Sequence, residues 1–532
     1  MTLSRREFLG AVAAVAGVGA GVGAGGLASA RSFVAAPALI GLPRKSGRTI
    51  TGGFADDGMA TGHALRDGTL HAAPSRTVRV PVVIVGGGIA GLSAAWELDR
   101  RGMHDFQLLE LLRDAGGNAR SGRNEVSEYP WAAHYLPVPG AKSTLVRELL
   151  AELGVLHADG TWDDRVLCFS PQERHHRFGE WHAGLEPDYA LSARERDEFR
   201  AFEALMDQHR ASGQFTLPLE SGVRRDSPLD RMSFAGWLRA SGFGSDTLAW
   251  YADYACRDDY GALARDTSAW AGVHYFASRQ KEEQGPLTWP AGNGWIVQQL
   301  MKKLGRYVRT GSPVVHIERD GSAWKVLTAD TAYRCEAVIF AAPRHVASHV
   351  IAELVGKRTG FVYSPWLTAN LTLDRWPKNV GVEPAWDNVI YGSPALGYVV
   401  ATHQSLATRE DRTVWTFYWA LAHESPASAR KRLLNDDWQT WAGRILDDLT
   451  RAHPDIRECV SRVDIMRHAH AMIRPTVGFL REPERVKPPA IPGLHFAHSD
   501  ASGISIFEEA QYQGVSAAKR VLRVVSHGHS DG

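Results

Sequence analysis

The chain has 532 residues, of which 44% are apolar and 22% are charged, and its formal net charge is +1 at pH 7. This is an ordinary globular composition, long enough for about two or three domains and a large core. Because the charge is near neutral and no basic stripe is interleaved with aromatic residues, a nucleic-acid-binding protein is not expected.

Residues 1–30 have the organisation of an export signal. Arg5 and Arg6 precede a run of Ala, Gly and Val that ends in Ala-Ser-Ala, the small-residue pattern cleaved by signal peptidases. The run is too rich in Gly for a membrane-spanning helix. The arginine pair resembles the twin-arginine signal, whose pathway carries proteins already folded around a cofactor. We therefore expect a periplasmic or otherwise extracytoplasmic protein, the twin-arginine export machinery as a partner, and no membrane span in the mature form.

Residues 31–78 are rich in Gly and Asp and show no sustained helical or strand period. We expect an extension that lies on the surface or winds over the first domain.

The pattern changes at Val82, where the sequence reads VVIVGGGIAGLSAAWELDRRG. The β-branched run Val82–Val85 is typical of a buried parallel strand. A helix is expected over residues 92–101, and a second strand over residues 106–109. This strand–helix–strand order is typical of a dinucleotide-binding unit.

Three glycines between the first strand and the helix form G-x-G-x-x-G. Gly86 permits the tight turn, Gly88 lets the backbone approach a pyrophosphate, and Gly91 lets helix and strand pack closely. The pyrophosphate is expected at the unpaired N–H groups that begin the helix. Nineteen residues after Gly91, an acid ends the second strand, where a carboxylate accepts ribose hydroxyls. The cofactor-binding residues predicted here are Gly86, Gly88, Ile89, Ala90, Gly91 and Glu110.

The segment LLRDAGGNARSG that follows resembles the second flavin motif of glutathione-reductase-type FAD proteins, in particular the flavin amine oxidase and phytoene desaturase superfamily. That motif usually reads Gly-Gly-Arg. Here Asn118 replaces the Arg, and Arg120 is expected to take over its phosphate or flavin contact. The resemblance implies that Gly117, Asn118 and Arg120 bind the cofactor and favours FAD over NAD.

Later segments resemble the same superfamily. Residues 286–305 look like its proline–glycine segment before a helix, and residues 312–343 alternate as three or four strands. The resemblance implies that Val314 holds the adenine through its backbone. In LHFAHSDASGISIFEEAQYQG it implies that Asp500 contacts the ribityl chain and that Phe507 opens a helix pointing at the flavin. We expect noncovalent FAD, because no Cys or His stands in a recognised attachment motif.

These motifs imply an α/β fold with a discontinuous Rossmann-like FAD-binding domain and a second α+β substrate domain. The FAD-binding domain is expected over residues 79–160, 286–349 and 481–525, and the substrate domain over residues 161–285 and 350–480.

The four cysteines lie far apart without a C-x-x-C pair, so no metal site is expected. One disulfide and four buried thiols are both compatible with their spacing.

The catalytic residues are less clearly marked. Amine oxidases place a lysine and an aromatic cage at the flavin, but the strand expected to carry the lysine, Trp366–Leu373, has none, and Ile506 stands at the cage position. Two polar segments, PWAAHYLPVPG and WYADYACRDDYG, are the alternatives. His134, Tyr135 and Asp258 are the catalytic candidates taken from them; the opposing interpretation is a structural histidine and an exposed turn.

We therefore predict an exported FAD-dependent oxidoreductase, similar to amine oxidases, that transfers a hydride from a small polar substrate, an amine or amino-acid derivative, to flavin N5. Oxygen or another electron acceptor would reoxidise the flavin. The alternatives are an FAD-dependent desaturase or isomerase of an apolar lipid or isoprenoid, and a non-catalytic flavin-binding protein.

Overall fold

The computed structural model of the chain describes residues 41–43, 49–55, 58–186, 191–219, 226–279, 285–407 and 410–528. All of them belong to one compact unit, Val34–Gly532. The export signal expected over residues 1–30 lies outside the described residues and stays a prediction. Among the helices that are described, none is long and apolar enough to cross a bilayer.

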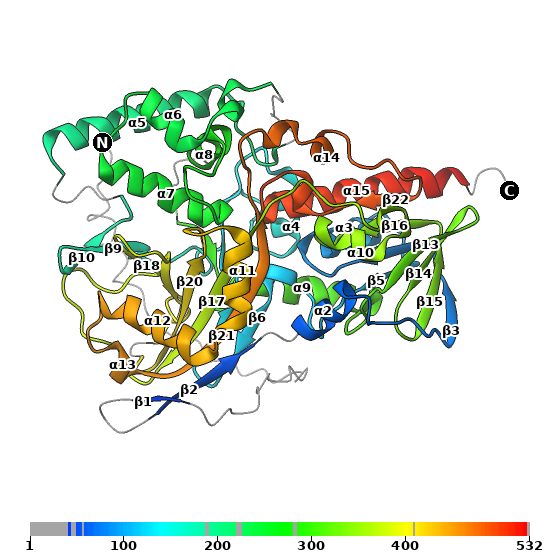
Figure 1. Cartoon of the computed structure of the whole chain (residues 1–532), viewed down its shortest axis with the longest axis horizontal. Helices are drawn as coiled ribbons and strands as arrows, with labels where there is room; N and C mark the ends of the chain where they lie inside the picture. Colours follow the sequence, from blue (N-terminus) through cyan, green and yellow to red (C-terminus); the bar gives the residue numbers. More distant parts are fainter. Residues whose placement is uncertain are drawn as a thin grey trace. The chain divides into compact units, whose positions relative to one another are not determined.

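A five-stranded parallel sheet carries the glycine-rich motif (Figure 1). Its strands, in spatial order, are β12 (Val308–Arg309), β5 (Phe106–Leu109), β4 (Val82–Val85), β16 (Ala337–Phe340) and β22 (Leu494–Phe496). All neighbouring pairs are parallel, although the strands come from three distant parts of the chain. The sheet confirms the α/β class expected from the strand–helix–strand pattern.

Helices from both ends of the chain cover this sheet. They are α3 (Ile89–Arg100), α4 (Thr144–Glu152), α9 (Gly294–Leu304) and α15 (Phe507–Gly528). α15 packs along α3, and apolar side chains of these helices form one core with Ile84 and Ile339 of the sheet.

The strands expected over residues 312–343 form a meander. β13 (His316–Asp320), β14 (Ala323–Leu327) and β15 (Thr331–Cys335) pair antiparallel, and β15 also pairs with β3 (Arg76–Arg79). The turn at Asp320-Gly321 falls between β13 and β14 as predicted, because Gly321 takes a φ of +67° there.

A nine-stranded sheet occupies the other half of the ribbon in Figure 1. Its strands, in spatial order, are β1 (Leu42–Pro43), β2 (Thr49–Phe54), β21 (Val460–Ile473), β17 (Tyr363–Leu373), β20 (Thr413–Ala420), β19 (Gly397–Val400), β18 (Asp387–Ile390), β9 (Glu173–Arg177) and β10 (Glu180–Ala183). Every residue of β17 and β20 is buried. β17 and β20 are therefore the centre of this sheet.

Helices complete this half of the fold. They are α5 (Ala193–Ala211), α6 (Phe234–Ala240), α7 (Asp246–Tyr260), α8 (Ala269–Ala277), α11 (Pro426–Asn435) and α12 (Trp438–Thr450). α5 begins with a capping box between Ser192 and Glu195. α11 and α12 are separate helices, because Asp437 accepts the Thr440 N–H and starts a new helix.

Shorter elements connect these layers: α2 (Met59–Arg66), β6 (Ser121–Arg123), β7 (Glu128–Pro130), β8 (Tyr135–Leu136), β11 (Leu287–Thr288), α10 (Arg344–Val350), α13 (Ile456–Cys459) and α14 (Pro483–Val486). The four cysteines are buried free thiols, so the disulfide alternative is not supported.

The extension predicted to lack regular structure is partly regular. β2 pairs in parallel with β21, and Ile50 is fully buried. The short segment TITGGF carries too few residues to show a strand period by itself. Its structure depends on a pairing partner more than 400 residues away, which local sequence does not reveal.

Candidate active site

The turn between β4 and α3 has the backbone geometry that its glycines predict. Gly86 has a φ of +104°, which other residues rarely adopt. A Cβ on Gly91 would overlap the Gly86 carbonyl. α3 begins at Ile89, earlier than expected, because the last motif glycine already lies within the helix.

α3 begins without a side-chain cap. Its N-cap, Gly88, supplies no side-chain acceptor, and its first turn has no acidic residue. By contrast, Ser or Asp side chains cap α5, α6, α7 and α12. The first N–H groups of α3 are therefore suited to an external anion, as the pyrophosphate of FAD requires.

Glu110 lies beside this turn at the end of β5. Its Oε2 accepts the Gly87 N–H over 2.6 Å, and its Oε1 accepts the Leu112 N–H over 2.8 Å. A carboxylate oxygen can accept more than one hydrogen bond. Glu110 thus fixes the turn and has the acceptor chemistry that the predicted ribose contact needs.

The second glycine pair packs against the first. The Gly116 N–H donates to the Gly87 carbonyl over 2.7 Å. Asn118 Nδ2 donates to the Ala471 carbonyl in β21 over 2.8 Å, and Arg120 Nε donates to the Gly117 carbonyl over 3.2 Å. The two predicted flavin motifs therefore form one surface.

The other predicted cofactor residues lie around this surface. Ile89 and Ala90 are buried in the first turn of α3, and Val314 is buried in the loop that leads to β13. The contacts predicted for Ile89, Ala90, Asn118, Arg120 and Val314 with FAD stay predictions.

Asp500 is a buried carboxylate with several donors. Its Oδ2 accepts the Arg344 N–H over 2.8 Å and the Tyr363 hydroxyl over 2.6 Å. His498 Nδ1 lies 3.0 Å from Oδ1. Burial alone would raise the pKa of Asp500, but His498 and the hydrogen bonds hold it below the usual value. Asp500 is therefore a fixed anion just before α15.

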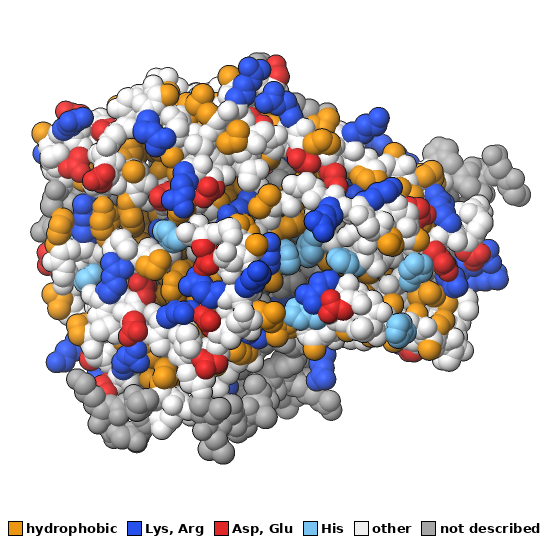
Figure 2. Space-filling model, viewed as in Figure 1, with side chains coloured by type: hydrophobic (Ala, Val, Ile, Leu, Met, Phe, Trp, Pro, Cys, Tyr) orange, Lys and Arg blue, Asp and Glu red, His pale blue; other side chains and the backbone are white. Residues whose placement is uncertain are grey.

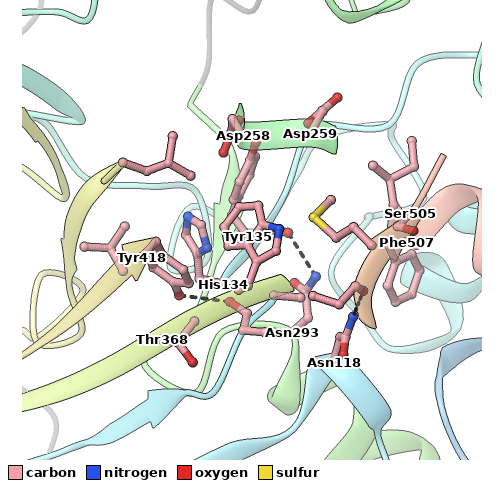
Figure 3. Close-up of a pocket in the computed structure, with 18 of the residues that line it drawn as sticks. Asn118, His134, Tyr135, Asp258, Asp259, Asn293, Thr368, Tyr418, Ser505 and Phe507 are labelled. Carbon is pink, nitrogen blue, oxygen red and sulfur yellow. Dashed lines mark hydrogen bonds between the residues drawn. The ribbon is translucent and has the colours of Figure 1, made fainter. Parts of the chain in front are cut away.

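A cavity of about 1050 Å³, which we call the inner chamber, lies at the N-terminus of α15. Figure 3 shows Phe507 and Ser505 on one side and Tyr418 and His134 on the other, with Asp258 and Asp259 above. The predicted catalytic and C-terminal flavin segments thus meet in one cavity.

His134 and Tyr135 are presented by the short strand β8. Thr288 Oγ1 donates to the His134 carbonyl over 3.1 Å, and Asn293 Nδ2 donates to the Tyr135 carbonyl over 2.9 Å. The His134 ring lies 4.6 Å from the Tyr418 ring, whose hydroxyl donates to the Ala132 carbonyl. Burial lowers the pKa of His134 to about 3, so the imidazole is neutral at pH 7. Burial also raises the pKa of Tyr135 well above its usual value.

The RDDYG segment is the last turn of α7, and its interpretation as an exposed turn is wrong. Arg257 and Asp259 are only 3% and 6% exposed. Arg257 Nη1 donates to the carbonyls of residues 393, 394 and 395 over 2.9–3.1 Å. Asp259 pairs with Arg279 over 2.7 Å. Asp258 and Asp259 line the inner chamber, whereas Arg257 is structural.

A second cavity of about 1380 Å³, the outer chamber, adjoins the first. The charged residues common to both linings are Asp258, Arg279 and Asp387. Burial and the charges of Glu173 and Asp258 raise the pKa of Asp387 well above its usual value. Burial and Asp259 likewise raise the pKa of Asp258, although Arg279 opposes this effect. Two carboxylates with raised pKa values therefore lie at the junction.

Several lining residues were not predicted from the sequence. Asp387 begins β18, Tyr418 lies in β20, and Arg279 follows α8. They carry no local motif, because only the packing of the nine-stranded sheet against α7 and α8 brings them together. The aromatic run of β20 was the one available signal, and it is also typical of a core strand.

None of the described residues that line the inner chamber is a lysine, and Ile506 stands in its wall. Glu509, the residue after Glu508 in α15, is fully buried and accepts the Leu219 N–H over 2.6 Å. Glu509 therefore joins α15 to the helical region.

Comparisons with known proteins agree with this geometry. A sequence-family profile described as flavin-containing amine oxidoreductase matches residues 89–522. The Mycobacterium tuberculosis (strain H37Rv) protein AofH, assigned as a flavin-containing monoamine oxidase, is 27% identical over 283 residues. This match spans 50% of the chain and 57% of AofH, so the chain covers little more than half of that relative's length.

Solved structures show the same fold. Wild-type putrescine oxidase bound to putrescine aligns with a TM-score of 0.62 and 16% identity, over 84% of this chain and 100% of that one. Cyclohexylamine oxidase from Brevibacterium oxydans IH-35A aligns with a TM-score of 0.62 and 15% identity, over 84% of this chain and 99% of that one. The CLA-producing fatty acid isomerase from P. acnes aligns with a TM-score of 0.59 and 15% identity, over 83% of this chain and 98% of that one. At these identities the likeness concerns the fold alone.

Proposed function

The chain belongs to the flavin-containing amine oxidoreductase family and is an FAD-dependent oxidoreductase, and from this premise we propose that it oxidises amines or amino-acid derivatives. The observation that carries the proposal is the pair of carboxylates, Asp258 and Asp387, in the walls of a cavity next to the predicted flavin site. A protonated amine supplies the positive charge that these groups lack.

Four features of the chain would hold FAD. The uncapped start of α3 suits the pyrophosphate, Glu110 the ribose, Asp500 the ribityl chain, and the N-terminus of α15 the flavin. When bound, FAD supplies a two-electron acceptor at N5. We propose noncovalent binding, with flavin released on acid precipitation; flavin that stays with the pellet would contradict it.

Asp258 has two tasks in this proposal. As an anion it attracts the substrate ammonium into the inner chamber. Because its pKa is raised, it is also a better proton acceptor than an ordinary aspartate. Transfer of one ammonium proton to Asp258 leaves a neutral amine, whose nitrogen lone pair forms the C=N bond as a hydride leaves the adjacent carbon.

His134 and Tyr418 would orient the substrate. Their rings form one wall of the inner chamber, and the neutral imidazole does not repel a cation. Aromatic faces also exclude water and attract cations. A hydride transfer needs the substrate carbon within about 3–3.5 Å of the acceptor. The position of these two rings therefore matters more for the transfer rate than their charge.

An anaerobic absorbance screen tests the proposed function. The purified flavoprotein is mixed with amines, amino acids, sterols and unsaturated lipids, and loss of the oxidised flavin spectrum is followed. We expect bleaching by amines or amino acids. Bleaching by the lipids alone would overturn the proposal and favour the desaturase or isomerase alternative.

We further propose that the protein is exported by the twin-arginine route. The support is the Arg5-Arg6 pair before an apolar run and a small-residue cleavage pattern. Changing both arginines to lysine should retain the precursor in the cytoplasm with FAD bound. Undiminished export of that variant would contradict this route.

A further inference from the structure

The strand β21 runs along one wall of the inner chamber and past the second predicted flavin motif. Arg120 Nη2 lies 3.5 Å from Met466 Sδ in this strand. Asn118 Nδ2 donates to the Ala471 carbonyl over 2.8 Å. His468 lies in the strand between these two contacts and lines the inner chamber together with Asn118. His468 therefore belongs to the wall of the chamber at which the flavin is expected.

The surroundings of His468 determine which of its ring nitrogens carries a proton. Its Nε2 lies 3.3 Å from the Trp131 carbonyl and 3.3 Å from Thr368 Oγ1. A carbonyl can only accept, and Thr368 already donates its hydroxyl proton to the same carbonyl over 2.6 Å. Both neighbours of Nε2 are therefore acceptors, so Nε2 is the nitrogen that carries the proton.

The other ring nitrogen, Nδ1, is then an unused acceptor. Burial and the charge of Arg120 lower the pKa of His468 to about 4, so the imidazole is neutral at pH 7 and Nδ1 keeps its lone pair. Nε2 accounts for the hydrogen bonds of this ring to other described residues. In Figure 3, Thr368 lies on the side of the cavity away from Asp258. The acceptor is therefore separate from the carboxylates proposed to attract the substrate.

An unused acceptor in this wall suits a cofactor that gains a donor during the reaction. In hydride transfer to flavin N5, the substrate C–H bond breaks with its electron pair and an N–H bond forms at N5. The reduced ring therefore has a donor at N5 that the oxidised ring lacks. A hydrogen bond accepted from this donor stabilises the reduced flavin relative to the oxidised one, and hydrogen bonds to ring nitrogens are a means by which proteins tune cofactors.

We infer that His468 tunes the flavin: its Nδ1 accepts a hydrogen bond from the N5–H of the reduced ring and thereby raises the reduction potential of the enzyme. This inference rests on the proposed transfer to N5 and is independent of the identity of the substrate. Thr368 and the Trp131 carbonyl then act as positioning groups, because they hold Nε2–H and leave Nδ1 unprotonated. A structural role alone would require only Nε2–H.

Two substitutions separate the two ring nitrogens. A Gln side chain reaches the position of Nε2 and can donate there, but it places no acceptor at the position of Nδ1. An Asn side chain places its amide oxygen near the position of Nδ1 and is too short to replace Nε2. If only Nε2–H matters, His468→Gln is the harmless change. If Nδ1 is the acceptor, His468→Asn is the change that preserves the potential.

The potential is measured by reducing the purified flavoprotein with dithionite in the presence of a reference dye, so that no substrate is needed. We expect His468→Gln to lower the equilibrium constant for flavin reduction about tenfold, the size of one net hydrogen bond. For a two-electron couple this is a fall of about 30 mV. His468→Asn should stay close to the wild type. His71→Gln, which replaces an exposed histidine, is the control and should not change the potential.

The affinity for oxidised FAD gives a second readout. Titration of the apoproteins should give the same Kd for the wild type and His468→Gln, because the oxidised ring has no N5–H. An unchanged potential in His468→Gln, or an equal fall in both variants, would overturn the inference. A weaker Kd with an unchanged potential would also overturn it, since His468 would then hold the ring in both redox states. If His468→Gln does not fold, a tenfold fall in His468→Asn is the contradicting result. Failure of every amine to reduce the flavin would instead overturn the proposed function.

Discussion

The cofactor region and the two chambers both contain buried carboxylates, but they surround them differently. Glu110 accepts two backbone N–H groups, and Asp500 accepts a backbone N–H and a tyrosine hydroxyl beside His498. Burial and Asp259 raise the pKa of Asp258 against the opposing charge of Arg279, and burial, Glu173 and Asp258 raise that of Asp387. The first pair is stabilised as anions by the fold itself. The second pair would be stabilised further as anions by a bound cation, as in the proposed amine site.

The largest effect is expected at Asp500. Asp500→Ala removes the oxygen that accepts the Arg344 N–H and the Tyr363 hydroxyl, and leaves both donors without this acceptor. The free energy of unfolding should fall by about 3 kcal/mol, with loss of bound flavin. Denaturant unfolding and the flavin-to-protein absorbance ratio measure both, with Asp105→Ala, which removes an exposed carboxylate, as control. A stable, fully loaded variant would show that these bonds are dispensable.

Glu110→Ala should act mainly on the cofactor. Removing the carboxylate takes away the predicted ribose contact and leaves the Gly87 N–H without its acceptor. FAD binding should weaken by about 1.5–3 kcal/mol. Titration of the apoprotein with FAD gives the change, and undiminished affinity would mean that the ribose is held by another residue.

Replacing Asp387 is expected to stabilise the folded protein, whereas the two substitutions above weaken it or its cofactor binding. A carboxylate with a raised pKa binds a proton more readily in the folded state, so it lowers stability as pH rises through that pKa. Asp387→Asn should therefore increase the free energy of unfolding by about 1–2 kcal/mol at pH 8, and should have little effect below pH 4. Urea unfolding at both pH values tests this, and destabilisation at pH 8 would mean that the anion has a partner in the fold.

The smallest effect is expected at His134. His134→Ala removes a wall of the inner chamber without removing a charge, since the imidazole is neutral at pH 7. Anaerobic flavin reduction by an amine should slow about fivefold, or about 1 kcal/mol, with unchanged FAD content. Asp258→Asn should slow it more. If the order is reversed, His134 is the proton acceptor and our assignment of Asp258 is wrong.

The parts of the molecule that could be predicted are those that depend on neighbours in sequence. Gly86, Gly91 and the start of α15 at Phe507 follow from turn geometry and helix signals, which are local. Asp387 and Arg279 reach the chambers only through packing of β18 and α8 against α7. Nothing within ten or so residues of either one distinguishes it from a surface charge.

The sequence pattern also gave a wrong expectation where a strand pairs with a distant part of the chain. β2 is a strand because β21 offers it an edge, and its own six residues show no clear alternation. Conversely, Asp258 was selected because charged residues crowd its segment, yet Arg257 in the same turn binds three carbonyls and stays away from the chemistry. The crowding of charged residues identified the segment. Only the positions of the two side chains around α7 distinguish Asp258, which lines the chamber, from Arg257, which binds backbone carbonyls.

The most direct test of the account is the number of protons released when a cation enters the chambers. A quaternary ammonium such as benzyltrimethylammonium carries no titratable proton and is titrated into the flavoprotein by calorimetry in buffers of different ionisation enthalpy. Because the pKa of Asp258 is raised to about 7, we expect proton release at pH 7 and a smaller release in Asp258→Asn. Binding without proton release at pH 7, or no binding at all, would contradict the claim that Asp258 and Asp387 await a cationic substrate.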